Sequence, residues 1–251
     1  MAETNISWTD RVWNPVIGCA KVSAGCTNCY AETMAVRLAA MGNENYREVV
    51  KGNRWNGRVK FLFHKMNEPL HWKKPCRVFV NSMSDLFHDD VSDEDIARIF
   101  GVMGDCPQHV FQVLTKRPAR MCQYLTEREK WSTRGTLPNV WLGVSCEDQA
   151  SAEERIPLLL QCPAAVRWVS LEPLLGRIIP SGDWFPGISW CVIGGETGAG
   201  YRKMDLDDFY ETENQFSESG CAVYVKQDSG PKPGMQGRLS DDVWNRKEYP
   251  R

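Results

Sequence analysis

The stretch RVFVNSMSDLFHDDVSDEDIARIFGVMGDC (77–106) contains the pattern that decides the fold. An apolar, β-branched strand (77–83) leads through polar residues into a helical stretch that begins at Ser92, an N-cap residue followed by early acids. The next segment repeats this order, because HVFQVLT (109–115) precedes a second helical stretch with Pro118 in its first turn. Short apolar strands that alternate with helices predict a parallel sheet covered by helices.

Strand–helix units of this kind recur along the chain. We expect strands over 77–83, 109–115, 139–145, 166–172, 189–195 and 221–227. Two more strands, over 58–63 and around WNPVIG (13–18), would bring the number to eight. The pattern therefore predicts one α/β domain over 1–251, either a (β/α)8 barrel or a partial (β/α)6 barrel with parallel strands, and an irregular tail from about residue 228. An open doubly wound sheet is the alternative.

The composition is that of a globular chain with reduced thiols. The 251 residues are 42% hydrophobic and 25% charged, and a net charge of −2 gives no chain-wide basic footprint for nucleic acid. Ten cysteines are too sparse for a disulfide scaffold, and we recognise neither a secretory signal nor an apolar run long enough to span a membrane. We therefore expect a cytoplasmic protein without a membrane partner. The ten tryptophans favour an aromatic core over a base-stacking surface.

Polar side chains follow almost every expected strand, at the end where α/β barrels place their active sites. Glu172, Glu196 and Lys226 follow directly on apolar runs, so we expect them to point into the mouth of the barrel. The full set of polar strand ends is Asn81, Ser82, Ser84, Asp85, Thr115, Lys116, Arg117, Ser145, Glu147, Glu172, Glu196, Lys226 and Gln227.

The loop GCAKVSAGCTNCYAE (18–32) brings Cys19, Cys26 and Cys29 together after the first expected strand. A structural zinc needs four ligands, and a distant residue would have to supply the fourth; the candidates are His64, His71 and Cys76. A [4Fe–4S] cluster can be held by three cysteines, with its fourth iron left open for another molecule. The loop favours the cluster, while zinc and the absence of a metal remain alternatives.

The same residues carry a family resemblance. A barrel with a three-cysteine loop resembles the radical S-adenosylmethionine (radical SAM) superfamily, and NPVIGCAKVSAGCTNCYAE (14–32) is similar to the opening of its spore photoproduct lyase-like branch. From Ile6 to Pro250 the chain also resembles a phage-borne family with a three-cysteine motif, for example at IGGETGAGYRKM (193–204) and VYVKQ (223–227). The spacing here is C-x6-C-x2-C, whereas C-x3-C-x2-C is common in the superfamily.

The resemblance implies an enzyme whose [4Fe–4S] cluster, on Cys19, Cys26 and Cys29, reductively cleaves S-adenosylmethionine to a 5′-deoxyadenosyl radical. An electron donor of the flavodoxin or ferredoxin type would be its partner, and a nucleotide or nucleic-acid base its substrate, as in phage DNA modification or repair. The residues expected to contact S-adenosylmethionine are Asn81, Ser82, Ser84, Asp85, Lys116, Arg117, Ser145 and Glu147. Those expected to face the substrate are Glu172, Glu196, Arg202, Lys226 and Gln227.

Two other functions remain open at this point. One is a nucleic-acid-binding barrel protein whose cysteine loop holds a structural zinc, and the other is a hydrolase-type barrel with incidental cysteines. The stretch KGNRWNGRVK (51–60) is basic and contains a tryptophan, which suits either a nucleic-acid contact or a solvated loop.

Overall fold

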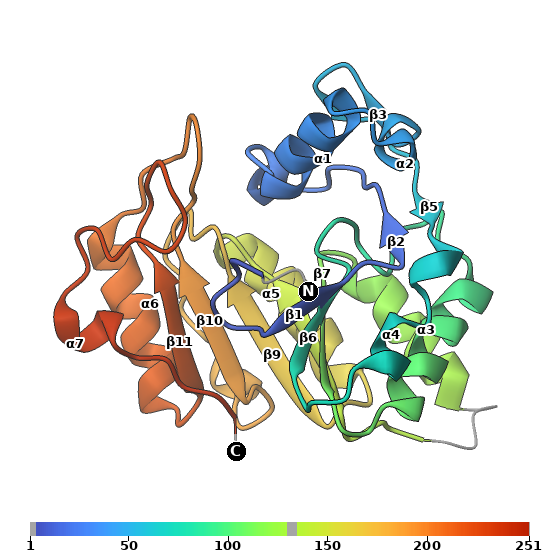
Figure 1. Cartoon of the computed structure of the whole chain (residues 1–251). Helices are drawn as coiled ribbons and strands as arrows, with labels where there is room; N and C mark the ends of the chain where they lie inside the picture. The colour runs from blue at the N-terminus through green and yellow to red at the C-terminus, as the bar shows by residue number, and fades with distance from the viewer. Residues whose placement is uncertain (1–3, 130–134, 251) are drawn as a thin grey trace.

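The computed structural model describes residues 4–129 and 135–250, and a curved parallel sheet lies at its centre (Figure 1). The strand order is β1-β6-β7-β8-β9-β10-β11, and every neighbouring pair is parallel. The strands are β1 (Arg11–Trp13), β6 (Arg77–Val80), β7 (Val110–Thr115), β8 (Val140–Ser145), β9 (Val166–Leu171), β10 (Trp190–Gly194) and β11 (Ala222–Gln227). The predicted α/β class with parallel strands is confirmed, and the seven strands form a half-barrel.

Two details of the prediction are corrected. The stretch 58–63 adds no strand to this sheet, because it contributes only β5 (Lys60–Phe61), which pairs antiparallel with β2 (Val16–Ile17). The expected strand at 13–18 is likewise divided between β1 and β2, with Pro15, which has no backbone N–H, between them. The sequential strand order also lacks the reversal of a doubly wound sheet, so that alternative is wrong.

Helices cover the outer face of the half-barrel (Figure 1). They are α3 (Asp93–Asp105), α4 (Pro118–Glu129), α5 (Gln149–Gln161), α6 (Leu206–Glu218) and the short α7 (Asp241–Trp244). The predicted N-cap is confirmed, since the Ser92 side chain accepts a hydrogen bond from the Asp95 N–H at 3.1 Å. Side chains alternate along each strand, so Val78 and Val80 pack into the core under the helices while Phe79 points to the inner face.

Aromatic side chains fill the inner face of the sheet. Trp8, from the segment before β1, meets Phe79 at a ring-centroid distance of 4.8 Å, Trp168 at 5.3 Å and Trp190 at 6.0 Å. The Tyr224 hydroxyl donates to the Ser7 carbonyl at 2.9 Å, which fastens the same segment to β11. The N-terminal segment therefore lies where further strands of a closed barrel would pack. The tryptophans of this cluster belong to the core, as the sequence predicts.

The chain between β1 and β6 (residues 14–76) first forms a separate lobe, residues 14–62, beyond the carboxyl ends of the strands, and then returns to the amino end of the sheet (Figure 1). The elements of the lobe are β2, η1 (Ala24–Cys26), α1 (Tyr30–Ala40), α2 (Glu44–Arg47), β3 (Val50–Lys51), β4 (Arg54–Trp55) and β5, and the returning segment contains η2 (Phe63–Lys65) and η3 (Glu68–His71). The lobe has its own small core, in which Ile17, Ala35 and Val49 are buried. A further short helix, η4 (Gly182–Trp184), follows β9.

Over residues 228–250 the chain is irregular apart from α7, and it packs back on β11. The Val225 N–H donates to the Arg246 carbonyl at 2.9 Å, and the Trp190 indole donates to the Glu248 carbonyl at 2.9 Å. None of the helices in the described ranges has the length and apolar character that a membrane crossing requires.

The Trp8 cluster leads to a prediction about stability. Trp8→Ala should lower the free energy of unfolding by about 3 to 5 kcal/mol, because it removes a buried indole and leaves a cavity between three aromatic rings. Urea unfolding followed by circular dichroism measures the change. Met41→Ala is the control, since its side chain is 76% exposed and the loss should stay within about 0.5 kcal/mol. A loss below about 1 kcal/mol for Trp8→Ala would show that the N-terminal segment does not hold the half-barrel together.

Candidate functional site at the carboxyl edge of the sheet

The cysteine loop lies at the edge formed by the carboxyl ends of the strands, called here the carboxyl edge. Gly18 sends the chain into this loop with a φ of 93°, a region that favours glycine. A Cβ atom at this position would lie 2.3 Å from the Arg58 carbonyl oxygen, so no other residue fits. The Gly18 N–H donates to the Met83 carbonyl at 3.0 Å. The start of the loop is thereby fixed against the segment that follows β6.

Cys19, Cys26 and Cys29 are partly buried free thiols. Burial raises the pKa of Cys19 to about 12, and the Asp85 carboxylate adds to this effect while Arg117 opposes it. Burial also raises the pKa of Cys29, and the neighbouring backbone N–H groups of α1 act in the opposite direction. Charge on Cys29 would raise the pKa of Cys19, and charge on Cys26 would raise that of Cys29, so the three sulfurs lie within electrostatic reach of one another.

A single metal ion and an iron–sulfur cluster require different arrangements of the three thiols. Within residues 4–129 and 135–250, no three His, Cys, Asp or Glu side chains converge on a point where one metal ion could bind. A cubane cluster has a different requirement, because each of its cysteines binds a separate iron. Cys76, one candidate for a fourth zinc ligand, contacts the His109 ring at 3.4 Å just before β6, at the amino end of the sheet. It therefore lies at the opposite edge from the cysteine loop.

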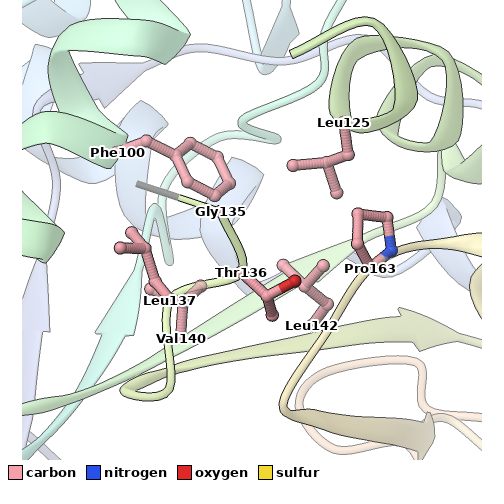
Figure 2. A pocket seen from close by; sticks show the side chains of 8 residues that line it. All are labelled: Phe100, Leu125, Gly135, Thr136, Leu137, Val140, Leu142 and Pro163. Carbon is pink, nitrogen blue, oxygen red and sulfur yellow. The ribbon is translucent and has the colours of Figure 1, made fainter. Parts of the chain in front are cut away.

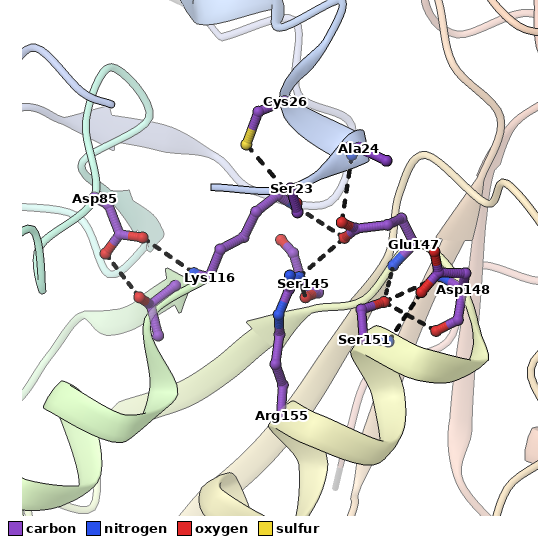
Figure 3. A network of polar contacts seen from close by, with 12 residues as sticks. Ser23, Ala24, Cys26, Asp85, Lys116, Ser145, Glu147, Asp148, Ser151 and Arg155 are labelled. Atoms are coloured by element: carbon purple, nitrogen blue, oxygen red, sulfur yellow. Dashed lines mark hydrogen bonds and ion pairs between the residues drawn. The ribbon is translucent and has the colours of Figure 1, made fainter. Parts of the chain in front are cut away.

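Glu147 holds one side of the loop from the end of β8 (Figure 3). Its carboxylate accepts hydrogen bonds from the Gly25 N–H at 3.3 Å and from Arg155 at 2.9 Å, and Lys116 lies 3.7 Å away. Burial alone would raise the pKa of Glu147, but Lys116, Ser23 and Arg155 together keep it below its usual value. Glu147 is therefore an ionised, almost fully buried anchor for the loop, and both of its oxygens have partners.

Glu196 holds the other side of the loop, beyond the end of β10. It accepts hydrogen bonds from the Asn28 side chain at 2.9 Å and from the Arg202 backbone N–H at 2.8 Å, and the Arg202 guanidinium pairs with both of its oxygens. Arg202 also donates to the Ala24 carbonyl at 3.0 Å. Burial would raise the pKa of Glu196, but the hydrogen bonds from Arg202 and Asn28 hold it below its usual value. Glu196 and Arg202 thus contact the loop.

Arg117 is placed beside Cys19 by a group of polar contacts after β7. Asp85 accepts from the Thr115 hydroxyl at 2.7 Å and from the Lys116 N–H at 3.0 Å, and it pairs with Arg117 at 3.3 Å. The Arg117 guanidinium also donates to the Ala20 carbonyl at 3.2 Å. A cation is therefore fixed next to the first cysteine of the loop.

The residues after β6 brace the beginning of the loop. Asn81 has a φ of 60°, which is uncommon outside glycine, and its side-chain oxygen accepts from the Val16 N–H at 3.3 Å. Ser84 donates to the Val16 carbonyl at 3.0 Å, and the Ser82 carbonyl accepts from the Tyr30 hydroxyl at 2.9 Å. The Asn81 side-chain NH₂ is buried and has no hydrogen-bond partner among the described residues.

Glu172 and Lys226 form an ion pair at the ends of β9 and β11. The Lys226 ammonium lies 2.9 Å from one Glu172 oxygen, whereas the other oxygen is buried and has no partner in the described part of the chain. Gln227 points away from this pair, because its amide donates to the Gly195 carbonyl at 3.0 Å and accepts from the Gly234 N–H at 2.9 Å. Ser145 is buried at the end of β8, and its carbonyl accepts from Arg155 at 2.7 Å.

The structure thus brings most of the predicted residues to the carboxyl edge and gives several of them partners in the cysteine loop. Residues that sequence reasoning missed are Ser23, Asn28, Tyr30 and Arg155, and all but Arg155 lie in the cysteine loop itself or directly after it. The position of Ser23, Asn28 and Tyr30 between or beside the cysteines is the sequence signal that could have identified them as site residues. Figure 2 shows a small cavity elsewhere, between α3, α4 and β8, with a largely apolar lining. Its one hydroxyl side chain, Thr136, gives it no chemistry comparable to that of the carboxyl edge.

One family model matches almost the whole chain. The family model described as "Protein of unknown function (DUF5131)" matches residues 3–245. No curated protein and no solved structure matches the chain.

The Glu196 contacts lead to a pH-dependent prediction. Glu196→Gln should lower the free energy of unfolding by about 2 kcal/mol at pH 7, since it removes the charge that Arg202 and Asn28 contact in a buried position. The folded-state pKa of Glu196 is lowered, so its stabilisation is present above the ordinary value of 4.5 and is lost as the pH falls. The difference between wild type and variant should therefore shrink below that pH.

Urea unfolding at several pH values measures this difference. Glu94→Gln is the matched control, because Glu94 is an exposed partner of Arg98 and the change should cost no more than about 0.5 kcal/mol at any pH. A Glu196→Gln loss that stayed the same from neutral to acidic pH would contradict the role of the ionised carboxylate.

Proposed function

The chain belongs to the DUF5131 family, and we propose that it is a radical SAM enzyme that holds a [4Fe–4S] cluster on Cys19, Cys26 and Cys29. The observation that carries the proposal is the fixed position of three free thiols at the carboxyl edge, with Arg117 beside Cys19. Metal binding would displace the proton of the Cys19 thiol, so the raised pKa of this thiol would make binding depend on pH.

The donor set and its surroundings fit such a cluster. Three thiols from one loop leave an open coordination position on a fourth iron, and the two buried carboxylates Glu147 and Glu196 hold the loop in one conformation. When bound, the cluster and S-adenosylmethionine would supply one-electron chemistry that abstracts a hydrogen atom from a C–H bond of the substrate.

The residues of the chain would bind and orient the reactants. Lys116 and Arg117 are two cations held close to the loop and suit a carboxylate such as that of the S-adenosylmethionine methionine moiety. The Asn81 NH₂ is a buried donor and one Glu172 oxygen is a buried acceptor, and neither has a partner among the described residues. Buried polar atoms without partners are costly, so a ligand that hydrogen-bonds to them would gain affinity. Ser82, Ser84, Asp85, Ser145 and Glu147 would act mainly by holding these groups and the loop in place.

For the substrate we propose a nucleotide or nucleic-acid base. The Glu172–Lys226 pair presents an acceptor beside an ammonium group, and a base edge carries N–H donors next to carbonyl acceptors. Glu196, Arg202 and Gln227 would support this side of the site from their own hydrogen bonds rather than by touching the base. A flavodoxin or ferredoxin type of protein would supply the electron.

Anaerobic reconstitution with iron and sulfide tests the proposal. The wild-type chain should bind iron in cluster form, with the visible absorbance of thiolate-bound iron–sulfur centres, and should cleave S-adenosylmethionine under reducing conditions. Cys26→Ala should lose both properties, because it removes one of three ligands.

Cys76→Ala is the matched control, since Cys76 is also a partly buried free thiol but lies at the opposite edge of the sheet. It should keep the cluster and the cleavage activity. A tightly held zinc without iron in the wild-type chain would overturn the proposal, and so would equal losses in the two variants.

A further inference from the structure

The loops that follow β10 and β11 lie side by side and are joined by backbone contacts (Figure 1). The first loop covers residues 197–204 and the second covers residues 229–238. The Gly198 N–H in the first loop donates to the Gly230 carbonyl in the second at 3.0 Å. A Cβ atom at Gly195 would lie 2.3 Å from a backbone nitrogen of the second loop, so the two loops are in close contact from their beginning.

The first loop also contacts the cysteine loop on both sides of Cys26. The Arg202 guanidinium donates to the Ala24 carbonyl at 3.0 Å, and the Asn28 side chain donates to the Gly200 carbonyl at 3.1 Å. Printed contacts therefore join three segments that are far apart in the sequence, and one of the three thiols lies within them. We call them the three-loop surface, which consists of residues 20–28, 197–204 and 229–238.

The three-loop surface contains cations and no acidic residue. Its Lys and Arg residues, in a chain whose total charge is −2, are Lys21, Arg202, Lys203, Lys232 and Arg238. Three of these cations pair with carboxylates of residues that are at most 8% exposed, namely Lys21 with Glu32, Arg202 with Glu196 and Arg238 with Asp228. Lys203 and Lys232 are exposed, and neither has an ion pair in the described part of the chain. Asp205, the acid that follows the first loop, accepts hydrogen bonds from N–H groups of α6.

Two exposed side chains of the three-loop surface have the character of protein contacts. Tyr201 is 37% exposed and Met235 is 42% exposed. Tyr201 lies within electrostatic reach of Arg238, whose side chain in turn donates to the Met204 carbonyl at 3.0 Å. Tyr, Met and Arg are enriched where proteins contact one another, whereas binding of a polynucleotide depends mainly on Lys and Arg at its phosphates. The composition therefore favours a protein partner with an acidic surface.

We propose that the three-loop surface is the docking site for an acidic one-electron donor protein of the flavodoxin or ferredoxin type. The inference rests on the proposed function, because the chain needs such a donor only if its thiols hold a cluster. The rate of electron transfer falls steeply with distance, so the donor must bind where the cysteine loop reaches the surface. The segment around Cys26 meets this condition, since Ala24 and Thr27 are exposed.

The docking step follows from charge complementarity. Carboxylates on the donor would pair with Lys203 and Lys232, which the fold leaves available. The donor would lose one electron to the cluster and separate in its oxidised form, with no bond formed between the two proteins. Transient redox complexes bury less than about 1,200 Å² in total, an area that suits three short loops. Charges at the rim of such a contact act mainly on the rate of association.

Biolayer interferometry with the full-length chain, without a cluster, and a purified flavodoxin measures this association. The wild-type chain should bind the flavodoxin, and the association rate should fall as salt is added, because salt screens exposed charges. The double variant Lys203→Glu, Lys232→Glu should lower the association rate at low salt about tenfold. Neither lysine has an ion pair within the described ranges, so the variant should keep the fold, which circular dichroism checks.

The double variant Lys73→Glu, Lys74→Glu is the matched control. It makes the same change in net charge, and both lysines are exposed just before β6, at the amino end of the sheet. It should leave the association rate close to that of the wild type. Equal slowing by the two double variants would overturn the proposal, since it would show that only the total charge of the chain matters.

A second measurement compares two reductants in the reconstituted protein. Dithionite is a small molecule that needs no docking surface, whereas reduced flavodoxin does. The ratio of flavodoxin-driven to dithionite-driven cleavage of S-adenosylmethionine should therefore fall about tenfold in the Lys203→Glu, Lys232→Glu variant and stay constant in the control. A ratio that is the same in both double variants would overturn the docking site and leave the proposed function intact.

Two further outcomes separate the inferences. Flavodoxin binding that depends on Lys203 and Lys232, without cleavage by either reductant, would overturn the proposed function while supporting the docking surface. A labelled single-stranded oligonucleotide that binds the wild-type chain and loses affinity in the Lys203→Glu, Lys232→Glu variant, with no binding of flavodoxin, would assign the surface to nucleic acid and overturn the proposal.

Discussion

Two buried carboxylates fix the loop on which the rest of the site depends. Glu147 and Glu196 are 1% and 5% exposed, and each is neutralised by an arginine, Arg155 or Arg202. Each also accepts a hydrogen bond from the cysteine loop, from Gly25 or Asn28. A buried acceptor that loses its donor costs about 1 to 3 kcal/mol, so the loop cannot leave the sheet without losing a hydrogen bond at each of these carboxylates. The positions of the three thiols are therefore set by β8 and β10.

The open sheet explains why the loop can lie where it does. The strand order is sequential, so β1 and β11 are its two ends, and the Trp8 segment packs on the inner face between them. The chain leaves β1 after Trp13 and enters the lobe at Pro15, which ends the pairing with β6. A closed barrel would need further pairing between β1 and β11. Here the short β1 releases the chain early, and the cysteine loop crosses to the ends of β8 and β10.

Much of the fold could be predicted because strands and helices are set by local patterns. The strands expected over 109–115, 139–145 and 221–227 agree with β7, β8 and β11 to within a residue at each end, since each apolar run is bounded by polar or turn residues. The stretch 58–63 has the same local pattern, but its partner is the two-residue β2, and nothing in the stretch itself specifies that partner. The local pattern determines that a segment can form a β-strand, whereas tertiary pairing determines which sheet that strand joins.

Local sequence patterns have the same limit when they are used to predict the contacts of the site. Alternation along β11 could have shown that Lys226 and Gln227 point to opposite faces, and only Lys226 meets Glu172. No local rule could pair Glu196 with Asn28, because 168 residues separate them. The sequence therefore predicts which edge of the sheet carries the chemistry, while long-range contacts decide which residues brace the loop.

The groups left without partners at this edge indicate what a ligand must offer. Most predicted polar side chains are satisfied by other residues, but the Asn81 NH₂ and one Glu172 oxygen are buried without a partner in the described ranges. Leaving a buried donor or acceptor unpaired costs about 1 to 3 kcal/mol. Asn81 also holds a left-handed backbone conformation, a further cost that its contact with Val16 offsets in part. A ligand that brings an acceptor to Asn81 and a donor to Glu172 would recover both costs on binding, so recognition at this edge follows from hydrogen bonds that the chain by itself does not complete.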